Sequence, residues 1–96
     1  MSVDEAANTH LIVGNKDYFS TLLKNGVYSA YVFTSFNLRE RKGTIEVRVS
    51  DNGVDDWMSL EPKNIVSNSY ANSDNAKAGH RRIVEEWKEK LAGYES

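Results

Sequence analysis

The sequence predicts an α+β fold, in which a three-stranded antiparallel β-meander is combined with helices that pack on one face. Residues 27–36 are rich in β-branched and aromatic side chains, which is typical of a strand. Residues 44–50 alternate strictly between polar and apolar side chains, as a half-buried strand does. Apolar residues near the C-terminus recur at helical spacing, which predicts a helix over about 74–92. The third predicted strand is 54–60.

Two short helices are predicted before the meander. Ser2 and Glu5 have the spacing of a capping box. A helical face follows over about 3–13, made of Val3, Ala6, Ala7, His10 and Leu11. A second short helix starts near Asn15 or Asp17, with an apolar face of Tyr18, Phe19, Leu22 and Leu23. Gly14 and Gly26 stand where glycine ends a helix, so each is interpreted as a stop.

The second and third strands of the meander are joined by Asn52-Gly53, a strong signal for a two-residue hairpin turn. Pairing across this turn places Ile45 opposite Leu60 and Val47 opposite Met58. The other face of the same pair then carries Arg48 opposite Trp57. A slip by one residue would place Trp57 opposite Val47 and expose Met58 and Leu60. The first register collects more apolar side chains on one face and is preferred.

The C-terminal third consists of a polar connection and the last helix. Residues 63–74 are rich in Ser and Asn, so we expect a mobile loop there, after Pro62 ends the third strand. The apolar face of the last helix is formed by Ala76, His80, Ile83, Val84, Trp87 and Leu91. Gly79 inside it costs about 1 kcal/mol relative to Ala, so the helix start could lie nearer Gly79.

Composition limits the class of protein. The chain of 96 residues is expected to form one domain, 1–96. It has no cysteine, no secretory signal pattern and no long apolar run, and we expect a cytoplasmic protein. Its 12 basic and 14 acidic side chains give a net charge of −2, which argues against a dedicated nucleic-acid binder.

No motif of a nucleotide-binding loop, a zinc protease or a serine hydrolase is present, and we expect neither enzymatic activity nor a cofactor. His10 and His80 lie on apolar faces of predicted helices, where packing is favoured over metal binding. The acidic run 51–56 lacks the glutamate that an EF-hand loop needs at its twelfth position, so it is interpreted as a turn, and no metal site is expected.

The leading hypothesis is a small protein-binding module. Its binding face would be formed by Arg48 and Trp57, extended by Tyr31 and Phe33 if they lie on the same side. The basic loop with Arg39, Arg41 and Lys42 would flank this face. A regulator or inhibitor of a larger protein fits such a chain, with a phage accessory protein as one plausible kind and either a monomer or a homodimer as its state. In the competing interpretation the first helix covers this face.

The alternative hypothesis is nucleic-acid binding. Without the first helix, the predicted order αβββα matches the topology of double-stranded-RNA-binding domains. The contacts would come from the basic loop and from the start of the last helix, namely Arg39, Arg41, Lys42, Lys77, Arg81 and Arg82. Convergence of these two basic features on one face would favour nucleic acid.

Overall fold

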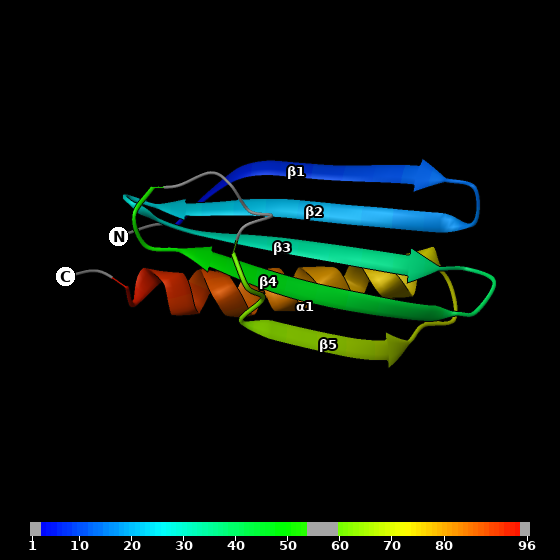
Figure 1. Ribbon diagram of the computed structural model, residues 1–96. Coiled ribbons are helices and arrows are strands. Elements are labelled where there is room, and N and C mark those ends of the chain that lie inside the picture. The colour runs from blue at the N-terminus through cyan, green and yellow to red at the C-terminus, as the bar shows by residue number, and fades with distance from the viewer. Residues whose placement is uncertain (1–2, 54–59, 95–96) are drawn as a thin grey trace.

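A computed structural model describes residues 3–53 and 60–94 of the chain. The fold is α+β, with a five-stranded antiparallel sheet in the order β1-β2-β3-β4-β5 and one C-terminal helix that runs along one face of it (Figure 1). The elements are β1 Asp4–Val13, β2 Lys16–Asn25, β3 Tyr28–Asn37, β4 Lys42–Ser50, β5 Asn64–Ser69 and α1 Ser73–Ala92. Every strand pairs with its neighbour in the sequence, so the sheet is a simple meander.

The two predicted N-terminal helices are wrong, because residues 3–26 form the hairpin of β1 and β2 and the turn into β3. Val13 pairs with Lys16 across Gly14-Asn15, and the next hairpin turns through Gly26-Val27. Both glycines have positive φ, 60° and 65°, at the first central position, which is where a type II′ hairpin turn places glycine. The glycines interpreted as helix stops are therefore turn residues.

The apolar residues of β2 fit two periods, which explains the error. Pairs such as Phe19 with Leu23 lie at helical spacing, and the same residues also lie on one face of a strand. In the structure Phe19, Thr21 and Leu23 are buried while the residues between them are half-buried. Pairing of β2 with both β1 and β3 satisfies its backbone on each side, and this non-local pairing decides between the two periods.

The first two predicted meander strands correspond to β3 and β4, but the predicted partner of β4 is wrong. Ile45 pairs with Val66 and Val47 with Asn64, so β5 occupies the side of β4 that was assigned to residues 54–60. The predicted strand 54–60 and Trp57 fall outside the described residues except for Leu60, which lies in a bend. The connection 63–74, expected to be a mobile loop, contains β5.

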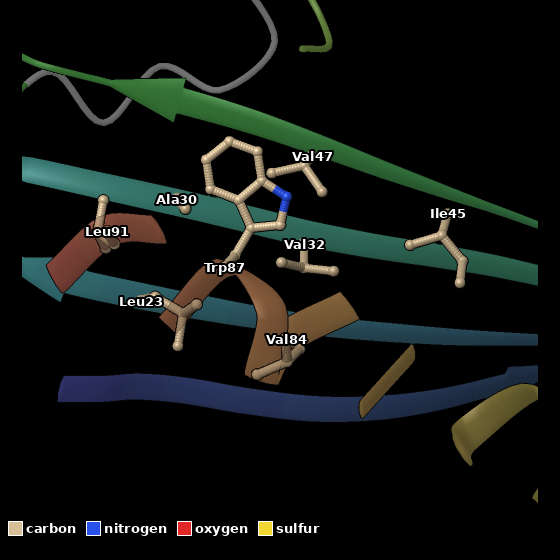
Figure 2. Close-up of a cluster of buried hydrophobic side chains, with 8 residues drawn as sticks. All are labelled: Leu23, Ala30, Val32, Ile45, Val47, Val84, Trp87 and Leu91. Carbon is tan, nitrogen blue, oxygen red and sulfur yellow. The ribbon is translucent and has the colours of Figure 1, made fainter. Parts of the chain in front are cut away.

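The hydrophobic core lies between α1 and the face of the sheet that it covers. Figure 2 shows the side chains of α1 and of the central strands meeting there, namely Leu23, Ala30, Val32, Ile45, Val47, Val84, Trp87 and Leu91. The predicted helix 74–92 is confirmed as α1, and its first turn is capped by Asn72, which accepts a hydrogen bond from the Asn75 N–H at 2.9 Å.

Gly79 has a packing reason to be inside the helix. A Cβ on Gly79 would lie 2.6 Å from the Tyr70 hydroxyl, and one on Gly43 would lie 2.8 Å from the opposite part of the same ring. The Tyr70 ring is therefore held between β4 and α1, with its edge against Phe36. The expectation that the helix starts near Gly79 is wrong, because α1 begins at Ser73.

A buried histidine adds a polar network to this core. His80 is almost fully buried, with Nε2 2.8 Å from Thr21 Oγ1 and Nδ1 2.6 Å from Thr34 Oγ1. The Thr21 hydroxyl donates its hydrogen to Asn8 Oδ1, so it must accept from His80, which fixes the proton on Nε2. Burial, reinforced by the positive charge of Arg81, lowers the pKa of His80 to about 4. The imidazole is therefore a neutral core residue at neutral pH.

Candidate protein-binding surface

The sheet has two different faces, and the face that points away from α1 is called the outer face. On β2, β3 and β4 the residues that alternate with the buried core positions point to this side; most are half-buried, and Lys16, Lys24 and Lys42 at the strand ends are exposed. Ser29 and Ser50 are buried exceptions near the end of the sheet. The outer face is thus built from the same strands as the core but carries a separate set of side chains.

Three aromatic rings form a row across the outer face. Tyr18 on β2 stacks beside Phe33 on β3 with a centroid separation of 5.8 Å, and Tyr31 stacks beside Phe33 at 6.2 Å. Leu22 is the cross-strand partner of Tyr31 and extends the row along β2. These contacts align large, stiff side chains at low entropic cost, which is a common property of protein-binding surfaces.

Arg48 lies beside this aromatic row, because its Cα partner across β3 and β4 is Tyr31. Its guanidinium donates to Glu46 Oε2 at 3.3 Å and to the carbonyl oxygen of Leu60. The structure thus brings Tyr31, Phe33 and Arg48 together on one face. The competing interpretation, in which a first helix covers this face, is wrong because residues 4–13 form β1.

The strand positions of the outer face carry a net positive charge, whereas the chain as a whole is negative. The sheet register places four cations and two carboxylates on this face, namely Lys16, Lys24, Lys42, Arg48, Asp4 and Glu46. The whole chain has a net charge of −2. Among the described residues, the strand positions of the outer face therefore carry more cations than carboxylates, and the aromatic row lies among them.

The basic loop Arg39–Lys42 is a firmly held turn at one end of this face. Asn37 Oδ1 accepts the backbone N–H groups of Arg39 at 3.0 Å and Glu40 at 3.2 Å. The Arg41 carbonyl accepts from the Tyr70 N–H at 2.9 Å, and Arg41 itself has a positive φ of 56°. Within the described part of the chain, Arg39, Arg41 and Lys42 make no ion pair, so their charges remain available to a partner.

The second basic feature is divided by the helix. Arg81 donates to Glu5 at 3.0 and 3.1 Å and to Glu85 at 3.0 Å, on the β1 side of α1. Arg82 lies on the other side, at a groove of about 360 Å³ between α1 and β5. His80 is in the core, and Lys77 is exposed one turn before Arg81. Arg81 and Arg82 therefore face different surfaces, and Arg81 is already neutralised.

One cluster of side chains superficially has the composition of a catalytic site. It consists of His10, Asp17 and Ser73. Asp17 stands in the centre, 2.8 Å from His10 Nε2 and 2.7 Å from the Ser73 hydroxyl. Burial alone would raise the pKa of Asp17, but its hydrogen bonds from Ser73 and His10 outweigh burial and lower it. The histidine does not touch the serine, so it cannot activate a nucleophile. The cluster ties β1, β2 and the start of α1 together.

The described residues show neither a metal site nor a membrane-spanning helix. Within 3–53 and 60–94, no group of three or more His, Asp or Glu side chains is arranged to hold a metal ion. α1 is too polar to cross a membrane, and the described chain has no other long helix. No family model, curated protein or solved structure matches the chain.

Sequence reasoning missed Tyr18 and Leu22 because it assigned them to a helix. The Gly14-Asn15 dipeptide is a signal for a two-residue hairpin turn, and it would have placed both residues in a strand. Both residues would then have joined the predicted binding face.

Proposed function

We propose that this protein is a small non-enzymatic binding module that recognises a larger protein through the outer face of its sheet and acts as its regulator or inhibitor. The observation that carries this proposal is the aromatic row Tyr18–Phe33–Tyr31 with Arg48 beside it, on the face opposite α1. Aromatic side chains and arginine are the residues most enriched among binding hot spots.

The chemistry of this face favours one kind of partner. Half-buried rings at the centre favour an apolar patch on the partner, because hot spots pair with complementary apolar groups. The surrounding lysines and the basic turn 39–42 favour an acidic border around that patch. A host protein bound by a phage accessory protein would be one such partner.

Site-specific photo-crosslinking tests the proposal. A benzoylphenylalanine placed at Phe33 should crosslink a defined protein in cells, while the same group at Glu86, on exposed helix surface, should not. The captured protein is then purified and titrated with wild type and with Phe33→Ala combined with Tyr18→Ala. Loss of two large aromatic contacts should weaken binding by about a hundredfold. Equal affinity of the double variant would remove the outer face from the proposal.

Nucleic-acid binding is the second candidate, favoured by the exposed cations of Arg39, Arg41 and Lys42, which make no ion pair with the residues that the structure describes. It is the weaker one, because Arg81 is engaged by Glu5 and Glu85. Its test is the fluorescence anisotropy of a labelled RNA duplex and a labelled single strand at about 50 mM salt. Binding that is lost when Arg41 and Lys42 are changed to Glu, with Phe33→Ala unaffected, would favour this candidate over a protein partner.

A further inference from the structure

β1 is a sheet edge with unusually little protection. All ten of its residues are exposed, and its tip carries three successive apolar side chains, with Leu11 60%, Ile12 66% and Val13 56% exposed. Residues 6–13 contain no proline, lysine or carboxylate, which are the usual means of blocking an edge. A bulge between Glu5 and Ala7 interrupts only its first part.

The other edge of the sheet is different. β5 has six residues, and apart from Ile65 and Val66 they are Asn and Ser. Pro62 lies just before β5 and has no N–H, so it has no backbone donor to offer a further strand at this end. β1 is a long, neutral edge with an apolar tip, whereas β5 is a short polar edge. Of the two, β1 is therefore the edge that can pair with another strand.

We propose that β1 pairs with β1 of a second copy of this chain, so that two five-stranded sheets join into one sheet across a two-fold axis. Residues 6–13 carry no formal charge, so two copies meet without repulsion, whereas a charged partner strand would find no complement there. Antiparallel pairing of one strand with itself is the symmetric arrangement of a closed dimer.

Hairpin geometry fixes which backbone groups are available. A two-residue turn closes on a hydrogen-bonded pair, Val13 with Lys16, so Leu11 and Thr9 also bond to β2. The N–H and C=O groups of His10 and Ile12 then point away from the sheet. Pairing His10 with Ile12 of the second copy uses these groups and places the two Leu11 residues directly opposite each other.

This register also brings the exposed apolar side chains of β1 together at the dimer interface. Leu11 faces its own copy on the outer face, and Val13 lies next to it opposite Thr9 of the second copy. Ile12 lies on the opposite side of the strand, opposite His10 of the second copy. The outer faces of both subunits become continuous, so the dimer presents two aromatic rows on one surface.

The full chain offers a matched pair of variants to test the dimer. Leu11→Lys places like charges opposite each other at the two-fold axis and should raise the dimer dissociation constant about tenfold or more in sedimentation equilibrium. Ile65→Lys changes a residue that is 58% exposed on the other edge and should leave the dimer intact. A wild type that stays monomeric up to about 100 μM would overturn the proposal, as would a dimer that survives Leu11→Lys.

Crosslinking tests the register independently. The chain has no cysteine, so Leu11→Cys introduces a single thiol. Opposed Cα atoms about 4.5 Å apart in a non-hydrogen-bonded pair are within disulfide range. Mild oxidation should link Leu11→Cys into dimers rapidly, while Ile65→Cys links only slowly by collision. Equal rates of linkage in the two variants would contradict the register.

Discussion

The two faces of the sheet are made by the same strands but differ in burial and in the kind of side chain that they carry. The inner face is closed by α1, and its apolar side chains surround a neutral histidine that two threonines satisfy. The outer face carries half-buried aromatic rings, Arg48 and several lysines. Alternation along each strand therefore separates the side chains of the core from those of the outer face.

Truncation of a core side chain should show the largest difference between the two faces. Trp87→Ala should lower the free energy of unfolding by about 3–5 kcal/mol, because a large buried ring is lost and a cavity remains. Phe33→Ala on the outer face should cost about 1–2 kcal/mol, since its ring is only half-buried. Urea unfolding followed by circular dichroism measures both, and equal losses would contradict the division of roles.

Trp87→Phe refines this comparison. The buried Trp87 Nε1 has no hydrogen-bond acceptor among the residues that the structure describes. Phenylalanine removes that unsatisfied donor and keeps most of the ring, so its cost should fall well below that of Trp87→Ala.

The inner face should also make stability depend on pH. The pKa of His80 is lowered to about 4 in the folded chain, from 6.5 for the free side chain. The unfolded chain therefore binds a proton first, and stability should decline as pH falls from about 6.5 to about 4, by about 3 kcal/mol in total. Glu5, whose pKa is lowered by Arg81 and Lys88, and Asp17 add their losses below about pH 4.

Unfolding free energies measured at several pH values would test this dependence. His80→Gln cannot gain the proton, so its stability should be nearly flat between pH 6.5 and 4.5 even if its absolute stability is lower. An unchanged slope in that variant would assign the pH dependence to other groups.

Gly79→Ala should give a smaller effect of unexpected sign. Helix propensity favours alanine by about 1 kcal/mol. The added Cβ would nevertheless collide with Tyr70, whose ring Gly43 holds from the other side, so we expect a net loss of about 1–2 kcal/mol. In a Tyr70→Leu background the same change should become neutral or stabilising. Thermal unfolding of the four variants gives the coupling, and additive effects would contradict the packing argument.

The smallest expected effect concerns the attachment of β1 to the helix. Glu5 Oε1 lies 3.0 Å from both Arg81 Nη2 and Lys88 Nζ. These groups are partly exposed, so the coupling of Glu5→Gln with Arg81→Met should be about 0.5 kcal/mol and should shrink in high salt. Glu86→Gln is the control, because its pairing with Lys90 at 3.7 Å lies within α1 alone. A larger, salt-independent coupling would show that this contact is part of the core.

Local patterns were sufficient to predict β3, β4 and α1. The apolar stripe of α1 includes His80, Val84 and Trp87 at helical spacing, and all three are buried where it predicts. The alternation of 44–50 correctly separates Ile45 and Val47 from Glu46 and Arg48. Hence part of the candidate face, with Tyr31 and Phe33, could be anticipated from the sequence.

The N-terminal part and the partner of β4 could not be predicted in this way. Residues 16–25 fit helical and strand periods alike, and their choice depends on the backbone partners that β1 and β3 supply. β5 is short and polar, so its own sequence does not indicate a strand; beside β4 it is held by the hydrogen bond of the Tyr70 N–H to the Arg41 carbonyl and by Val66, which pairs with Ile45.

By itself, the sequence determined which side chains share a face on β3, β4 and α1, because the period of each of these elements is unambiguous. Only the tertiary structure decided that five strands form the sheet, that Tyr18 joins Tyr31 and Phe33, and that β1 remains as a neutral edge. The physical reason is that a strand is stabilised by hydrogen bonds and side-chain packing from segments distant in the chain, which no local pattern contains.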